Sequence, residues 1–345
     1  MKFKKSVCAL TLAAVLVAPA WAAGRRNIHI VGSSTVYPFT TAVAERFARA
    51  NPGIPAPIVE STGTGAGMKL FCAGVGERFP DIEDASRRMK ASEAKLCASN
   101  GVTQVTEIQI GLDGIVLAGS KKSPALNITT KDLYLALAAN PYGKPNRAKT
   151  WHDVNAKLPN IPIRVYGPPP TSGTRDAIGE LLMTPPCEQN AGIQALKKSN
   201  PDKEKAICTG MREDGAFIEA GENDNLIVQK LEATPGSYGM FGYSYLAENS
   251  GALQAATFNG VAPSYNSIAN FSYPGARPLF LYIKNAHVAA IPGIRQFLAE
   301  YTRETTWGPG GYLARRGMIA APDAVRAKSV QLARALSPLA FASLK

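Results

Sequence analysis

Three short turns rich in serine, threonine and glycine have the residue types needed to bind an anion. Each follows an apolar run and opens a helix-like pattern, and the turns lie at residues 32–38, 61–67 and 171–176. Small residues let a ligand approach the backbone, hydroxyls donate hydrogen bonds, and a helix N-terminus adds unpaired N–H groups and the positive end of its dipole. A single turn of this kind is most often only a helix cap. Three in one chain predict that several helix ends converge on one anion.

The elements that must position these turns are short strands and the helices that follow them. Apolar runs predict strands at 27–31, 57–60 and 161–166, each shortly before one of the turns. Helical spacing of apolar residues predicts helices at 40–50, 68–73 and 175–183, and Asn-Pro-Gly or Pro-Pro ends the first and the last of them. Repeated strand–turn–helix units predict an α/β fold with mainly parallel sheets.

The rest of the chain adds elements of the same kinds. Strands are predicted at 108–118 and 278–284, and helices at 292–302 and 325–336. Residues 243–251 and 258–274 are expected to be irregular surface chain, since the second segment is rich in Gly, Asn, Ser and Pro. The total length suits two domains of ordinary size.

Residues 1–22 have the pattern of a secretory signal peptide. Lys2, Lys4 and Lys5 precede an uncharged apolar run at 7–18, and Ala-Trp-Ala at 20–22 fits a small-x-small cleavage site. The run is shorter than the about 20 residues that a membrane-spanning helix needs. We therefore expect a soluble protein that is exported to the periplasm.

The basic charge of the chain is dispersed. Removal of the leader's three lysines lowers the formal net charge from +12 to +9 (12 − 3). The remaining basic residues occur at most in pairs, such as Arg87-Arg88, and no basic run alternates with aromatic residues that could stack on bases. Nucleic-acid binding is therefore disfavoured, whereas attraction of a small anion remains open.

The four cysteines that follow the leader predict disulfides. An even number in an exported chain favours bridges over free thiols. Three connectivities are possible, and we favour Cys72–Cys97 with Cys187–Cys208 because it closes the two shortest loops. The chain has no Cys-x-x-Cys pair and its three histidines stand alone. We therefore expect neither a metal site nor a cofactor.

In their order along the chain, these motifs resemble those of the periplasmic phosphate-binding proteins of phosphate ABC importers. The matching segments are 32–38, 63–67, 84–87, 113–114, 172–176, 239–245 and 277–279. The resemblance implies a type II periplasmic-binding fold with two lobes, each a mixed sheet flanked by helices, and a ligand cleft between them. It implies a discontinuous first lobe at 24–113 plus 257–345 and a second lobe at 114–256.

The resemblance also implies which groups contact phosphate. Hydroxyl and backbone N–H groups of the three turns would surround the anion, and the residues concerned are Ser34, Thr35, Val36, Thr64, Ser172, Gly173 and Thr174.

Two positions depart from the family pattern. Many family members have an aspartate where this chain has Arg87, and an arginine where it has Pro168. We hypothesise that Arg87 supplies the charge-assisted hydrogen bonds that Pro168 cannot. The family's aspartate accepts the proton of a protonated phosphate, and the candidates for this role next to the motifs are Asp84, Asp113 and Asp176. If none of them reaches the ligand, we expect poorer discrimination between phosphate and sulfate than is usual in the family.

Two of the residues beside the turns have more than one interpretation. Arg175 could contact the anion or pair with an acid across the cleft. Asp113 could contact the anion, but we favour a role in orienting the segment that crosses between the lobes.

The function that this resemblance implies is high-affinity binding of inorganic phosphate and its delivery to a membrane permease by a monomeric receptor. Arg87 and Pro168 keep open a receptor for another tetrahedral oxyanion, sulfate or arsenate. A phosphate-ester hydrolase is disfavoured because the chain has no Gly-x-Ser-x-Gly elbow and no set of metal ligands.

Overall fold

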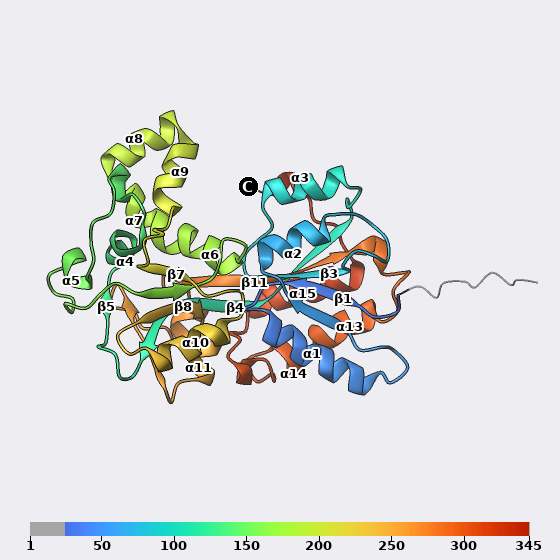
Figure 1. The fold of residues 1–345 in the computed structure, drawn as a ribbon. Helices are drawn as coiled ribbons and strands as arrows, with labels where there is room; N and C mark the ends of the chain where they lie inside the picture. The colour runs from blue at the N-terminus through green and yellow to red at the C-terminus, as the bar shows by residue number, and fades with distance from the viewer. Residues whose placement is uncertain (1–24, 345) are drawn as a thin grey trace, which may run out of the picture.

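The computed structural model describes residues 25–344, which form a mixed β-sheet with helices on both of its faces (Figure 1). The strand order is β2-β1-β3-β11-β4-β8-β6-β7, and β9 pairs with the end of β4. The strands of this sheet are β1 (His29–Gly32), β2 (Ile58–Ser61), β3 (Ile82–Ala85), β4 (Val105–Ser120), β6 (Val165–Gly167), β7 (Phe217–Glu219), β8 (Tyr238–Gly242), β9 (Leu253–Ala255) and β11 (Ala276–Lys284). A separate pair contains β5 (Asn127–Ile128) and β10 (Thr257–Phe258).

Two strands in the middle of the sheet connect two lobes. The first lobe contains the parallel strands β2, β1 and β3, and the second contains the parallel strands β8, β6 and β7. β4 pairs with β11 through residues 105–114 and with β8 through residues 115–119, in both cases antiparallel. The long apolar run of β4 is buried because neighbouring strands and helices cover it.

Helices cover both faces of each lobe (Figure 1). Those of the first lobe are α1 (Tyr37–Ala50), α2 (Thr64–Phe71), α3 (Ala91–Ser99), α13 (Ile294–Tyr301), α14 (Glu304–Trp307) and α15 (Asp323–Ala335). Those of the second lobe are α4 (Thr130–Leu137), α5 (Trp151–Val154), α6 (Gly173–Ala177), a π-helical segment (Ile178–Met183), α7 (Thr184–Glu188), α8 (Ala191–Ser199), α9 (Pro201–Thr209), α10 (Asp224–Ala233) and α11 (Tyr243–Glu248). α12 (Tyr265–Ala269) packs on the crossing strands β4 and β11. Short 3₁₀ turns lie at Pro141–Gly143, Asn285–His287, Ala314–Arg316 and Phe341–Ser343.

Each face of the sheet has its own apolar core. In the first lobe, Phe47 and Phe297 belong to the core under α1 and α13, while Phe71 belongs to the core under α2 and α3. In the second lobe, Leu133 and Ile227 belong to the cores on opposite faces. This layered arrangement confirms the predicted two-lobed α/β fold.

The expectations of irregular chain at 243–251 and at 258–274 are both wrong in part. Residues 243–248 form α11, in which Tyr245 and Leu246 are buried against β4 and β8. Residues 265–269 form α12, in which Ile268 is buried. Helices of five or six residues are too short to show helical periodicity, so their formation depends on tertiary packing.

Both predicted disulfides are confirmed. Cys72–Cys97 joins the end of α2 to α3, and Cys187–Cys208 joins α7 to α9. Within residues 25–344, no helix combines the length and apolar character needed to cross a membrane. The predicted signal peptide lies outside the described residues.

The chain returns to the first lobe through β11. Phe258, Ile268 and Tyr273 belong to a core that also contains Leu133 and Met240 of the second lobe. The segment at 257–273 therefore packs with the second lobe, and the lobe boundaries given above, with a division at 256/257, remain a prediction.

Candidate anion-binding site

Arg277 lies at the centre of a buried polar cluster where the two lobes meet. Its side chain is 2% exposed. Nη2 donates hydrogen bonds to the hydroxyl oxygens of Thr35 and Thr174, both at 3.0 Å, and to the carboxylate of Asp113 at 2.8 Å. The two threonine hydroxyls lie 3.1 Å apart. The predicted residues Thr35 and Thr174 are thus brought together from opposite lobes.

Strand pairing places Arg277 opposite Asp113. The two residues are direct partners in the antiparallel β4–β11 ladder, where opposite charges on facing residues stabilise the pair. Asp113 also accepts a hydrogen bond from the backbone N–H of Tyr243 at 3.0 Å. Burial raises the pKa of Asp113, and the Arg277 guanidinium opposes that rise. Both carboxylate oxygens thus have partners, and the role of Asp113 in orienting the crossing segment remains a prediction.

A second pair of hydroxyls lies at the start of α2. Thr64 Oγ1 is 3.3 Å from Ser86 Oγ and accepts a hydrogen bond from the Ser86 backbone N–H at 3.2 Å. A Cβ added to Gly173 would lie 2.5 Å from Thr64 Oγ1 and 2.6 Å from Ser86 Oγ. Only glycine permits this approach between the start of α6 and the start of α2, so the second and third turns meet across the cleft.

The three turns differ in how their helices begin. α1 and α2 have no side-chain cap, whereas Ser172 Oγ caps α6 by accepting a hydrogen bond from the Thr174 N–H at 3.1 Å. The N–H of Val36 bonds to the carbonyl of Ser33 at 3.2 Å. The N–H of Gly65 in the first turn of α2 bonds to the carbonyl of Thr171, in the second lobe, at 3.0 Å. The second lobe therefore supplies an acceptor for one of the otherwise unpaired N–H groups at the start of α2 in the first lobe.

Arg87 lies near the second turn, but its described partners are carboxylates. It contacts Glu93 of the first lobe at 2.6 Å and Asp176 of the second lobe at 2.7 Å. Burial alone would lower the pKa of Arg87, but these two carboxylates raise it above its ordinary value. Direct contact between Arg87 and an anion remains a prediction.

Two other candidates lie away from the Arg277 cluster. Arg175 contacts the Pro168 carbonyl at 3.1 Å, Glu219 at 3.5 Å and the ring of Phe217, all within the second lobe. Asp84 is buried beneath the first turn, where the N–H of Ser33 bonds to its backbone carbonyl at 2.9 Å. Burial raises the pKa of the Asp84 side chain well above its ordinary value.

The sequence-based predictions did not include three charged residues near the cleft: Arg277, Asp224 and Glu222. Nη1 of Arg277 and both carboxylate oxygens of Asp224 are buried without a hydrogen-bond partner among residues 25–344. Burial raises the pKa of Asp224 to about 7, with Arg277 opposing that rise and Asp113 adding to it. A lone arginine before a proline at the start of an otherwise apolar strand was the available signal for Arg277. The only sequence signal for Asp224 was its position in the first turn of a helix, α10.

Glu222 of the second lobe reaches the start of α2. It accepts a hydrogen bond from the Thr171 hydroxyl at 2.5 Å, and its carboxylate lies against Gly63, which has a φ of 81°. Burial raises the pKa of Glu222. Within the described part of the chain, no group of three or more His, Cys, Asp or Glu side chains is arranged to hold a metal ion.

Comparison with known proteins assigns the family. A model of the PBP superfamily domain matches residues 17–305. Protein SphX of Synechococcus elongatus is 34% identical over 78% of this chain and 71% of its own length. The phosphate-binding protein PstS of Staphylococcus saprophyticus is 26% identical over 77% of this chain and 73% of its own length.

A solved structure supports the same fold. It is an ABC-type phosphate transport receptor from Vibrio cholerae, with a TM-score of 0.57 and 19% identity over 85% of this chain and 99% of that chain. The sequence matches and the fold agree: the chain belongs to the PBP superfamily and to the family of SphX, and it is similar to the phosphate-binding protein PstS.

Proposed function

We propose that this protein binds inorganic phosphate in the cleft between its lobes, outside the cytoplasm, and delivers it to the membrane permease of an ABC importer. It acts as a monomer and binds neither nucleic acid nor a cofactor. The observation that carries the proposal is the buried cluster in which Arg277 joins Thr35 of one lobe to Thr174 of the other. Relatives named as phosphate-binding proteins supply the substrate class.

The chemistry of this cluster suits a tetrahedral oxyanion. Arg277 supplies a permanent positive charge and a buried Nη1 donor that has no protein partner among residues 25–344. The first and third turns add the hydroxyl and N–H donors of Ser34, Thr35, Val36, Ser172, Gly173 and Thr174, and the second turn adds Thr64. Donors from both lobes meet only when the cleft is closed, so the anion favours the closed form.

We assign to Asp224 the acid that discriminates between oxyanions. It is buried beside Arg277, and its two oxygens have no hydrogen-bond partner in the described chain, while the nearby N–H of Gly242 opposes the rise of its pKa. Above its pKa of about 7, the ionised Asp224 carboxylate can accept the proton of a protonated phosphate or arsenate. Sulfate has no proton to offer at neutral pH, so the pair would be repulsive. This preference favours phosphate over the sulfate alternative.

Calorimetry on protein stripped of bound anion tests the proposal. We expect phosphate and arsenate to bind in the cleft and sulfate to bind much more weakly. Thr174→Val removes a buried hydroxyl and should weaken phosphate binding about 10-fold or more, since an unsatisfied buried partner costs about 1–3 kcal/mol. Thr103→Val, at an exposed position just before β4, is the control.

Two outcomes would contradict the proposal. Equal affinity for sulfate and phosphate would show that Asp224 does not discriminate between them and would favour a receptor for tetrahedral oxyanions in general. Sustained turnover of a chromogenic phosphate ester, lost in the Thr174→Val protein but not in the Thr103→Val protein, would replace the receptor by a hydrolase.

A further inference from the structure

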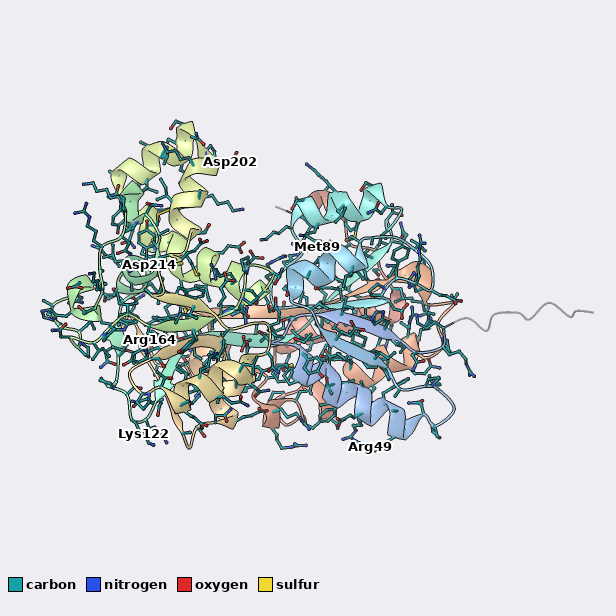
Figure 2. All side chains as sticks on the ribbon, in the orientation of Figure 1. Arg49, Met89, Lys122, Arg164, Asp202 and Asp214 are labelled. Atoms are coloured by element: carbon teal, nitrogen blue, oxygen red, sulfur yellow. A yellow bond between two sulfur atoms is a disulfide. The ribbon has the colours of Figure 1, made fainter. Side chains whose placement is uncertain are left out.

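Five charged side chains form a line that crosses from the first lobe to the second beside the third turn. Arg87 and Lys90 belong to the segment between β3 and α3, which Met89 marks in Figure 2, and Glu93 lies in the first turn of α3. Asp176 and Glu180 belong to α6 and the π-helical segment. The N–O distances between the lobes are 2.7 Å for Arg87–Asp176, 3.0 Å for Lys90–Asp176 and 3.8 Å for Lys90–Glu180.

The first lobe holds Arg87 in place independently of the second. Nη1 and Nη2 donate to the two carboxylate oxygens of Glu93 at 2.9 and 2.6 Å. Glu93 itself accepts a hydrogen bond from the N–H of Lys90 at 2.9 Å and thereby caps α3. This bidentate geometry fixes the plane of the guanidinium and leaves Nε to donate to Asp176.

In the second lobe, Asp176 is directly linked to the proposed anion site. It lies in the first turn of α6, two residues after Thr174, and its own N–H bonds to the carbonyl of Ser172 at 3.2 Å. Movement of the Asp176 carboxylate would therefore also displace Thr174, which lies in the same helical turn and contacts Arg277.

Charge and burial make this contact favourable for closure. The three side chains of the first lobe have a net charge of +1, and the two of the second lobe have −2. The side chains of Arg87 and Asp176 are 7% and 27% exposed, so water screens their attraction less than it does for exposed pairs. In the described chain, the contacts of Asp176 and Glu180 with Arg87 and Lys90 are the salt bridges between the two lobes, apart from the Arg277–Asp113 pair on the crossing strands. The hydrogen bonds Gly65–Thr171 and Tyr245–Ser34 also join the lobes, but they involve uncharged groups.

We propose that Arg87 and Asp176 form a charged tie that holds the cleft closed in addition to the anion. Arg87 is then a positioning residue: it retains α6 and its turn against the first lobe and slows release of the bound anion. This proposal rests on the proposed function for its effect on release. The tie itself acts on the protein alone.

The first experiment is X-ray scattering by anion-free protein. Wild-type protein should be more compact than the Asp176→Asn variant at low ionic strength. The difference should narrow as ionic strength rises from about 0.01 to about 1 M, because the Debye length falls from about 30 to about 3 Å and the partly exposed Asp176 carboxylate is screened. Arg88→Met is the matched control, since Arg88 is the next residue and pairs with Glu107 inside the first lobe.

The second experiment measures phosphate release by stopped flow. Asp176→Asn and Arg87→Met should each accelerate release about 10-fold, which is about 1.4 kcal/mol. The double variant should release phosphate no faster than Asp176→Asn alone, because Asp176→Asn already removes the contacts of Asp176 with both Arg87 and Lys90. Arg88→Met should leave the rate unchanged.

Two results would overturn the tie. One is that the X-ray scattering of anion-free protein and the rate of phosphate release are both the same in Asp176→Asn and in wild type. The other is loss of phosphate binding in Arg87→Met while Asp176→Asn binds normally, which would make Arg87 a ligand of the anion. The scattering experiment is done without anion, so it would detect the effect of the Arg87–Asp176 contact on compactness even if the protein did not bind phosphate. Failure of the proposed function can therefore be distinguished from failure of this proposal.

Discussion

Arg277 connects residues that the chain separates by more than a hundred positions. Its bond to Thr35 spans 242 residues and its bond to Thr174 spans 103. Burial of a charged pair such as Arg277–Asp113 carries a desolvation cost, which the pair's hydrogen bonds and mutual attraction offset only when the geometry is good. A buried cluster of this kind is therefore more readily explained by ligand binding than by stability.

Asp224 should make the stability of the protein depend on pH. Its pKa is raised to about 7 by burial, against about 3.9 for an unperturbed aspartate. The folded state thus favours the protonated acid, and this contribution is present below about pH 4 and is lost as the pH rises to about 7. Urea unfolding should show wild type losing up to about 1.4 kcal/mol per pH unit relative to Asp224→Asn across that range.

The control for this prediction is Asp202→Asn. Asp202 also lies in the first turn of a helix, α9, but it is exposed on the α8–α9 projection (Figure 2). Its substitution should leave the pH dependence unchanged. Parallel stability curves for wild type and Asp224→Asn would show that Asp224 does not titrate in this range.

At the scale of elements, the start of α6 must fit against the start of α2. Gly173→Ala adds a methyl group where Thr64 Oγ1 and Ser86 Oγ would lie 2.5 and 2.6 Å away, well inside van der Waals contact. Both lobes should fold normally, because residue 173 is helical and accepts alanine. Closure should be impaired, and calorimetry should show phosphate affinity lowered by about 10-fold or more, or about 1.4 kcal/mol.

Gly192→Ala provides a matched control for this steric argument. Gly192 also lies in the first turn of a helix, α8, and its added Cβ would meet only the Asn190 side chain, at 3.2 Å. Phosphate affinity should be unaffected. Equal affinities for Gly173→Ala and wild type would mean that the two turns do not need to approach this closely in the bound state.

At the scale of the whole molecule, the binding of phosphate should stabilise both lobes together. A ligand that binds only the folded state contributes about 2.7 kcal/mol at 100 times its dissociation constant. Thermal unfolding should therefore shift upward as a single transition with added phosphate, since the proposed ligands come from both lobes. Sulfate at the same concentration should give a much smaller shift. A shift confined to one of two resolved transitions would place the anion within a single lobe.

The sequence predicted the helices and strands that surround the three turns better than it predicted the second lobe's outer helices. α1 has a periodic apolar face, and Asn-Pro-Gly follows it, so its limits depend on local chemistry. α11 and α12 have no such signal, because packing against β4 and the neighbouring core stabilises them. Local patterns were sufficient where one face of a long element is buried, and insufficient for single turns.

The sequence by itself determined the three turns, the α/β class and the family, since residue types, spacing and motif order express these properties. It favoured one disulfide pairing of three, and the structure confirmed that pairing. Only the tertiary structure decided which charges meet. It paired Arg87 with Glu93 and Asp176, and it brought Arg277 to Thr35 and Thr174. The physical reason is that a turn's backbone preferences are local, whereas the partner of a buried charge is selected by strand register and lobe contact across the whole chain. The sequence identified the three turns as hydrogen-bond donors, but it did not identify Arg277 as the cation between them.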